Sequence, residues 1–391
     1  MEKVLTGLDV FRRGAWQKFT GKRVGILANQ ASVDASLSTT AEVVEKCLPG
    51  SVAALFGPQH GYRGEDQDNM VETSDAEDHL TGVPVFSLYS RTREPLPHML
   101  ENIDLLIVDL QDVGTRVYTF ASTLKNCLQA CAVHGVDVVV LDRPNPIGGD
   151  RIEGNVLDSG FFSFVGPACI PMRPGLTLGE LAFLVNDEFE IGCGLEVVPM
   201  RGWRRGMLWK DTGLRWLMPS TNMPCPETAS VYPGQVIWEG TNISEGRGTC
   251  RPFEIFGAPF LNTSLVRKNI SATDLSGCYL QDYMFRPTFH KWSGDLCRGF
   301  MLHVTDPERY EPYYTSICLL QAVFEVHPDD FKWRDPPYEY EYEKTPIDLI
   351  LGNRELRLDL ESGMKPAELR SRWFSDLAEF DERRARYYLY R

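Results

Sequence analysis

Long apolar segments are missing from this sequence. No run approaches the roughly 20 residues that a membrane-spanning helix needs. The first residues, MEKVLTGLDVFRRGAW, also lack the apolar core of a secretory signal peptide. For the sequence as it stands, we therefore expect a cytoplasmic protein with no membrane partner.

Several motifs for cofactors are absent as well. The first predicted strand, at residues 23–29, continues into NQASVD and not into the GxGxxG turn of a dinucleotide-binding fold. The Gly-Lys-Ser/Thr end of a P-loop is missing, and so are the HxH and HExxH spacings of many metal enzymes. These absences lead us to predict no cofactor and no metal site.

Positive charge and closely spaced cysteines are also scarce. The chain has 40 Lys and Arg against 54 Asp and Glu, so its net charge of -14 argues against nucleic acid as a partner. The ten cysteines are scattered, and Cys127 with Cys131 has no second pair nearby. We expect reduced, mostly buried thiols and no zinc site.

In the sequence, short apolar runs typical of strands alternate with segments of helix length. Strands without internal alternation, separated by helices, are typical of an α/β protein with a parallel sheet covered on both faces. The length of 391 residues favours two domains, and we place the boundary near Thr228, which gives domains at 1–228 and 229–391. We expect strands at 23–29, 52–56, 83–88, 104–110, 136–141, 195–200 and 299–304, helices at 39–47, 97–102, 118–134, 176–191, 311–326 and 365–384, and a solvated charged helix at the C-terminus.

Polar residues directly follow three of the predicted strands, at 59–69, 109–116 and 142–153. Right-handed crossovers place the carboxyl ends of parallel strands along one edge of a sheet, so these clusters should meet in one crevice. A glycine-rich stretch at 239–251 is expected to be an irregular, exposed loop. The polar residues that it would expose are Glu239, Asn242, Glu245 and Arg247.

These residues suit more than one kind of site. A glycoside hydrolase needs one acid to protonate the leaving oxygen, and a second carboxylate or the substrate's acetamido group as nucleophile. A metal-dependent hydrolase with Mg²⁺ or Zn²⁺, and a binding module without turnover, are the alternatives. Carboxylates for the first are Glu65, Asp66, Asp109, Asp112, Asp142, Glu153, Glu239 and Glu245, ligands for the second are His60, Asp109, Asp112 and Asp142, and arginines that could clamp a substrate carboxylate are Arg63, Arg116, Arg143 and Arg247.

Six segments together resemble one known family. They are FGPQHGYRG, DLQDVGTRVYTF, LDRPNPIGG, GLTLGELA, PSTNMP, and VYPGQVIWEGTNISEGRGT with PFEIFGAP. In this order they look like the NamZ-type exo-β-N-acetylmuramidases, formerly a domain of unknown function. The resemblance implies a Rossmann-like domain, a smaller C-terminal α/β domain and an active-site cleft where they meet. It also implies a bacterial, metal-independent glycosidase of cell-wall recycling, which releases N-acetylmuramic acid from the non-reducing end of peptidoglycan fragments.

One departure from the family affects the expected chemistry. Members of the family have Glu-His-Gly where this chain has Gln59-His60-Gly61, and the glutamate is the family's leading candidate for the catalytic acid. A glutamine has no ionisable proton to donate. Either Glu65 or Asp66 takes over the role, or this chain binds or cleaves a different amino sugar, or it binds without cleavage.

We therefore predict a small carbohydrate as the substrate and a site built from both domains. Glu65 is our first candidate for the acid/base, with Glu245 second and His60 as a further catalytic residue. Asn222 and Asn242 suit the recognition of hydroxyl or acetamido groups. The substrate-binding residues predicted are Gln59, Arg63, Asp112, Arg116, Asp142, Arg143, Asn222, Glu239, Asn242 and Arg247.

Overall fold

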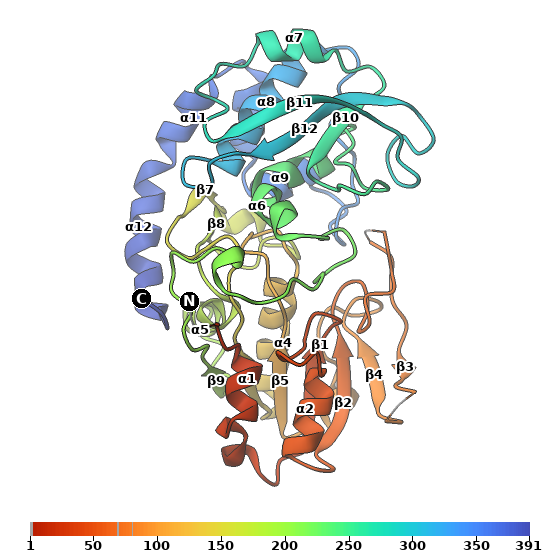
Figure 1. Ribbon diagram of the computed structural model, residues 1–391, viewed down its shortest axis with the longest axis vertical. Helices are drawn as coiled ribbons and strands as arrows, with labels where there is room; N and C mark the ends of the chain where they lie inside the picture. The colour runs from red at the N-terminus through yellow and green to blue at the C-terminus, as the bar shows by residue number, and fades with distance from the viewer. Residues whose placement is uncertain (1–2, 69, 80) are drawn as a thin grey trace.

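A seven-stranded sheet forms the centre of the first part of the chain, with the strand order β3-β4-β2-β1-β5-β6-β9 (Figure 1). The computed structural model describes residues 3–68, 70–79 and 81–391, so Asn69 of the predicted polar cluster lies outside the described residues. All neighbouring strands are parallel except β3 and β4, which confirms the predicted fold class. The strands are β1 (Val24–Ala28), β2 (Val52–Gly57), β3 (Ala76–Glu77), β4 (Pro84–Ser87), β5 (Leu105–Asp109), β6 (Asp137–Leu141) and β9 (Leu195–Val198).

Helices cover both faces of this sheet, and alternate strand residues point to each side. In β1, Ile26 packs into one core with α1 and α2, whereas Leu27 packs into the other core with α4 and α5. Because both faces are buried, the strands read as continuous apolar runs in the sequence. The helices of this part are α1 (Gly7–Arg12), α2 (Thr40–Cys47), α3 (Pro97–Leu100), α4 (Phe120–His134) and α5 (Leu178–Glu188).

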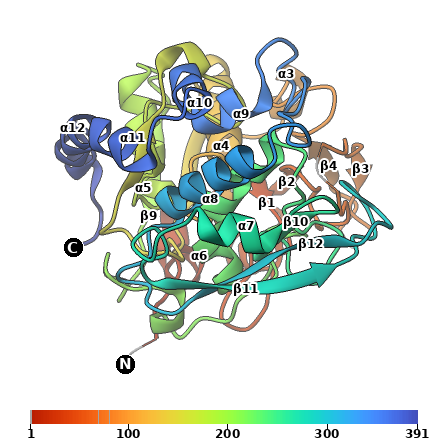
Figure 2. The same cartoon turned by 90° about the horizontal axis from the view of Figure 1, so that it is seen from above.

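The second part has an antiparallel sheet in the order β10-β12-β11, which lies at the opposite end of the molecule from the large sheet (Figure 1). Figure 2 shows this antiparallel sheet from above. Thr228, near our proposed boundary, lies inside α6. None of the helices among the described residues is long and apolar enough to cross a bilayer. The remaining elements are β7 (Glu153–Val156), β8 (Pro171–Arg173), α6 (Pro226–Gln235), β10 (Ile255–Ala258), α7 (Thr263–Lys268), β11 (Cys278–Phe285), β12 (Cys297–Val304), α8 (Pro312–Val326), α9 (Pro346–Leu351), α10 (Arg354–Glu361), α11 (Pro366–Arg372) and α12 (Phe374–Arg384).

The glycine-rich stretch 239–251 differs from the prediction, because it is largely buried. Glu239, Glu245 and Arg247 are each at most 5% exposed. Trp238, which precedes them in the 3-10 helix η4 (Val236–Gly240), is fully buried and draws the segment inward. Arg247 forms ion pairs with both glutamates, which offsets the cost of removing their charges from water. The sequence did not reveal this pairing, so we took the charges as a sign of exposure.

The C-terminal tail also differs from the solvated helix that we expected. Helix α12 ends at Arg384, which is buried and donates hydrogen bonds to the carbonyl oxygens of Gly149 and Pro174. Beyond it, the hydroxyl of Tyr390 donates to Asp142 Oδ2 at 2.7 Å and accepts from the backbone of Met200 at 3.0 Å. The tail therefore packs against the first part of the chain.

Candidate active site

A small cavity lies between the two parts of the chain, at the carboxyl ends of β2 and β5. Its volume of about 30 Å³ gives room for about two water molecules. The lining residues of the first part are Gln59, His60, Val117–Phe120, Val165, Ser220, Asn222 and Met223, and those of the second part are Tyr232, Glu239, Arg247, Phe253, Tyr338 and Glu339.

Gln59 is held in one orientation by two hydrogen bonds. The hydroxyl of Thr119 donates to its Oε1 at 2.6 Å, and its Nε2 donates to Glu339 Oε1 at 3.0 Å. An ionised Glu339 oxygen can only accept, so in that state Nε2 and not Oε1 of Gln59 must face it. Gln59 therefore joins the loop after β2 to a carboxyl group from the other part of the chain.

Glu339 is the carboxyl group of this cavity with the most perturbed titration. It is only 4% exposed, and burial raises its pKa to about 7. The hydroxyl of Tyr89 donates to its Oε2 at 2.7 Å, and this bond and the one from Gln59 lower the pKa in part. Desolvation outweighs both bonds, so a large fraction of Glu339 carries a proton near neutral pH.

Glu239 and Arg247 form the charged side of the cavity. Arg247 Nη2 lies 2.7 Å from Glu239 Oε1, and the hydroxyl of Tyr338 donates to Glu239 Oε2 at 2.6 Å. Arg247 is 5% exposed, and its Nη1 has no hydrogen-bond partner among the residues that the structure describes. A buried guanidinium nitrogen without a partner at a cavity wall is suited to bind an anionic group of a ligand.

Glu245 lies behind Arg247 and does not line the cavity. Its carboxylate is fully buried between Lys291 at 2.8 Å, Arg247 at 3.2 Å and His290 at 3.3 Å. Burial by itself would raise the pKa of Glu245, but Lys291, His290 and Arg247 together hold that pKa well below its usual value. A carboxylate held ionised in this way supports Arg247 and is poorly suited to donate a proton.

His60 is neutral at physiological pH. It has a positive φ of 73°, and its Nδ1 lies 2.9 Å from the carbonyl oxygen of Asp66. Burial, assisted by the charge of Arg247, lowers the pKa of His60 to about 4. With the proton on Nδ1, the Nε2 atom is an acceptor. His60 can therefore accept a hydrogen bond from a ligand hydroxyl, but it is a weak base.

Three aromatic side chains form an apolar wall of the cavity. Tyr118 and Tyr232 meet edge to face with ring centroids 5.9 Å apart, and Tyr232 and Phe253 do the same at 4.8 Å. Asn222 is buried beside them, and its Nδ2 donates to the carbonyl oxygen of Gln67 at 2.9 Å. The predicted residues that the structure brings together here are thus Gln59, His60, Asn222, Glu239 and Arg247.

Glu65, our first candidate for the acid, lies outside the cavity. It is exposed on the loop after β2, where its Oε2 accepts a hydrogen bond from the backbone N–H of Arg63 at 3.1 Å. The guanidinium of Arg63 forms an ion pair with Asp78. Neither side chain is among the residues that line the cavity around Gln59.

Four other predicted residues have structural contacts instead of a place at this cavity. Arg143 pairs with Asp109 at 2.5 Å and lines a different cavity. Asn242 bonds to the main chain of Asp330 and Lys332. The other two are fully buried: Arg116 donates to the carbonyl oxygens of Asn155, Ile170, Ile350 and Leu351, and Asp142 accepts from the backbone of Arg143 and Gly179 and from the hydroxyls of Thr177 and Tyr390.

Asp112 lies beside the cavity's β5 loop but points elsewhere. Its Oδ1 accepts from the backbone of Gly114 at 2.6 Å, whereas the buried Oδ2 has no partner in the described part of the chain. Burial raises the pKa of Asp112 to about 7. A carboxyl group whose pKa is higher in the folded than in the unfolded chain contributes to the free energy of unfolding. The contribution is complete at a pH below the pKa of the unfolded chain, and it is lost as the pH rises toward 7.

We therefore expect Asp112→Asn to be more stable than the wild type at pH 8. The gain in free energy of unfolding should be on the order of 1 kcal/mol, because the variant does not bury a charge. Urea unfolding at pH 5 and pH 8 measures it, with the surface change Asp295→Asn as the control. A difference between variant and wild type that does not grow with pH would contradict the assignment.

The sequence analysis missed Glu339, Tyr338 and Tyr89. Glu339 and Tyr338 belong to the run PPYEYEYE at 336–343, in which acids alternate with tyrosines after two prolines. Glu339 and Tyr340 both have a positive φ, at 46° and 66°, so the backbone is strained where the acid meets the cavity. The acid–tyrosine alternation was the available signal, and we had not singled it out.

A metal centre has no counterpart in this arrangement. Within residues 3–68, 70–79 and 81–391, no three side chains of His, Cys, Asp or Glu converge as ligands would. Two of the four residues named for that alternative have other partners, since Asp109 binds Arg143 and Thr40 while Asp142 accepts four hydrogen bonds.

Comparison with known proteins covers nearly the whole chain. A family model described as exo-beta-N-acetylmuramidase NamZ, N-terminal, matches residues 24–227, and the corresponding C-terminal model matches residues 230–390. The peptidoglycan beta-N-acetylmuramidase NamZ of Bacillus subtilis strain 168 is 39% identical over 388 residues, which cover 99% of this chain and 92% of that protein.

Two crystal structures of DUF1343 family proteins from Bacteroides fragilis share the fold. One is 33% identical with a TM-score of 0.89, and the other is 27% identical with a TM-score of 0.75. Each comparison covers 100% of this chain and 99% of the other chain. The likeness therefore extends through both parts of the molecule.

Proposed function

The chain belongs to the NamZ family of exo-β-N-acetylmuramidases, and we propose that it hydrolyses the linkage of N-acetylmuramic acid at the non-reducing end of peptidoglycan fragments. The observation that carries this proposal is the cavity that presents a protonatable Glu339 and an unpaired Arg247 nitrogen. The first supplies an acid for the leaving oxygen, and the second fits the lactyl carboxylate of this sugar.

Glu339 is the general acid in this proposal, in place of Glu65. Its pKa of about 7 provides a proton at neutral pH, while Gln59 and Tyr89 fix the position of the carboxyl group. This arrangement also gives Gln59 a function. The Gln59 amide is uncharged and holds Glu339 through a hydrogen bond. A glutamate at position 59 would share a proton with Glu339.

The remaining groups have roles that follow from their contacts. Glu239, which pairs with Arg247, stabilises positive charge at the anomeric carbon as the bond breaks. His60 Nε2 and Asn222 bind hydroxyl or acetamido groups, and the aromatic wall packs against the face of the ring. Residues 1–228 and 229–391 are the two domains that we propose to form the cleft.

Glu339 gives its proton to the glycosidic oxygen while the bond from that oxygen to the anomeric carbon breaks. The acetamido oxygen of the substrate, or Glu239, supports the carbon on its other side. Water then adds to the carbon and returns a proton to Glu339. The products are free N-acetylmuramic acid and the shortened fragment.

An aryl β-N-acetylmuramide tests this function, with the matching N-acetylglucosaminide as control. We expect hydrolysis of the muramide with a kcat/KM at least about 100-fold higher, because only this substrate pairs with Arg247 Nη1. Equal rates would show that Arg247 does not recognise the lactyl carboxylate. Saturable binding of the muramide without release of the aryl group would show a binding protein and overturn the proposal.

A further inference from the structure

A second cavity lies at the point where the strand order of the large sheet reverses. The chain passes from β1 to β2 on one side and later adds β5 and β6 on the other side. The cavity is lined by residues that follow β1, by Gln111 after β5 and by Arg143 after β6. Open α/β sheets bind ligands in the crevice at such a point. None of its lining residues belongs to the cavity around Gln59.

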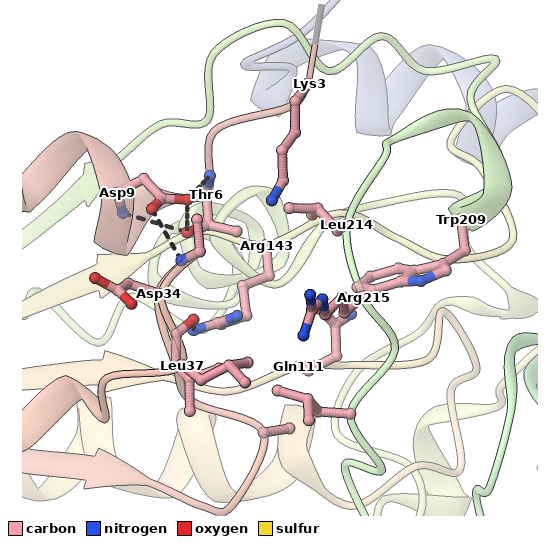
Figure 3. A pocket seen from close by; sticks show the side chains of 14 residues that line it. Lys3, Thr6, Asp9, Asp34, Leu37, Gln111, Arg143, Trp209, Leu214 and Arg215 are labelled. Atoms are coloured by element: carbon pink, nitrogen blue, oxygen red, sulfur yellow. Dashed lines mark hydrogen bonds between the residues drawn. The ribbon is translucent and has the colours of Figure 1, made fainter.

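Three cationic side chains face this space (Figure 3). Lys3 and Arg215 are exposed at its mouth, and neither forms an ion pair with any described residue. Arg143 is 6% exposed at its base, where Nε and Nη2 bind Asp109 and Nη2 also binds the carbonyl oxygen of Val33. These bonds fix the plane of the Arg143 guanidinium group. They use Nε and Nη2, so Nη1 is the nitrogen that can bind a ligand in the cavity.

The two acids of the lining have partners of their own among the described residues. Asp9 accepts hydrogen bonds from Thr6 and from the backbone of Ala35. Asp34 pairs with Arg12 at 2.6 Å and accepts two backbone N–H groups of its own loop. Both carboxylates are thus satisfied within the wall of the cavity.

Two buried polar atoms of the lining have no hydrogen-bond partner within the described ranges, Gln111 Oε1 and Trp209 Nε1. Gln111 Nε2 donates to the carbonyl oxygens of Asp112 and Pro144, so its orientation is fixed and Oε1 must be the remaining atom. Gln111 is 2% exposed and Trp209 is 7% exposed. Such atoms need a donor and an acceptor, respectively, from something that fills the cavity.

We propose that this cavity is a binding site for a small oxyanion that also carries a hydroxyl group, such as hydrogen phosphate or a 2-hydroxy carboxylate. The cations bind the charged oxygens, Trp209 donates to one of them, and the hydroxyl donates to Gln111 Oε1. The cavity volume of about 40 Å³ holds about three water molecules, which is compatible with an anion of this size.

Isothermal titration calorimetry of the full chain at constant ionic strength tests the proposal. The probes are inorganic phosphate, lactate and, as a matched anion without the hydroxyl, acetate. We expect phosphate or lactate to bind with a dissociation constant below about 10 mM and acetate to bind about tenfold more weakly. The anion that binds more tightly distinguishes a phosphate site from a hydroxy-acid site.

Variants separate this cavity from the catalytic one. Arg215→Ala and Lys3→Ala should each weaken binding about tenfold, and both residues are exposed, so folding should be preserved. Arg298→Ala removes an exposed arginine elsewhere and should have no effect. Three results would overturn the proposal: no binding of either phosphate or lactate at about 10 mM, binding of both that is no tighter than that of acetate, or binding that is unchanged in Arg215→Ala or lost only in Arg247→Lys.

Discussion

Glu339→Gln should lower kcat on an aryl β-N-acetylmuramide by about 100-fold or more, with little change in substrate affinity. The glutamine keeps the shape of the side chain but cannot donate an ionisable proton to the leaving oxygen. Steady-state kinetics with direct measurement of binding separates kcat from affinity. The expected loss is large because Glu339, whose pKa is raised to about 7, is the proposed source of the proton in this cavity.

The control for this variant is Glu65→Gln, which removes an exposed carboxylate of the neighbouring loop. We expect its kcat to stay within about twofold of the wild type, since Glu65 is exposed and does not line the cavity around Gln59. The reverse result, with activity lost in Glu65→Gln and kept in Glu339→Gln, would return the acid to the residue suggested by sequence.

The pH dependence of kcat is a second test of the role of Glu339. Glu339 is active as the protonated acid, so kcat should fall as the pH rises through about 7. In Gln59→Glu a second carboxyl group would stand where the Gln59 amide now donates to Glu339 at 3.0 Å. Repulsion between the two carboxylates should raise the pKa of Glu339, so the fall of kcat should move to higher pH. If kcat falls at the same pH in Gln59→Glu as in the wild type, the carboxyl groups of residues 59 and 339 do not interact in the active enzyme.

Arg247→Met should lower the free energy of unfolding by about 3 kcal/mol or more. Removing this cation leaves Glu239 and Glu245 buried with an incomplete set of partners, and an uncompensated buried charge is costly. Urea denaturation at neutral pH measures the loss. Any variant that remains folded should also lose its preference for the muramide over the glucosaminide.

Arg23→Met is the matched control, because Arg23 forms an ion pair with Asp104 at the surface, where the two side chains are 53% and 37% exposed. Exposed pairs contribute little to stability, so this change should have a small effect on unfolding. Comparable losses in the two variants would show that the buried ion pairs of Arg247 add little to stability.

Much of the large sheet could be predicted from the sequence, for a physical reason. Runs such as those at 104–110 and 136–141 are apolar throughout because both faces of the sheet are buried, and their ends are marked by polar residues. The six ordered segments also identified the family, which the comparisons confirm. Edge and hairpin strands such as β3 and β11 were missed, because solvent-exposed positions weaken the apolar pattern.

The sequence by itself determined the sheet, the family and the absence of an acid at position 59. Only the tertiary structure decided which carboxyl group stands beside Gln59, because Glu339 is 280 positions away along the chain. Glu65 is close to Gln59 in the sequence, but this closeness does not show where its side chain points. In the folded chain the Glu65 side chain is exposed to solvent. Burial then raises the pKa of Glu339 to about 7, and the surroundings that cause this shift exist only in the folded chain.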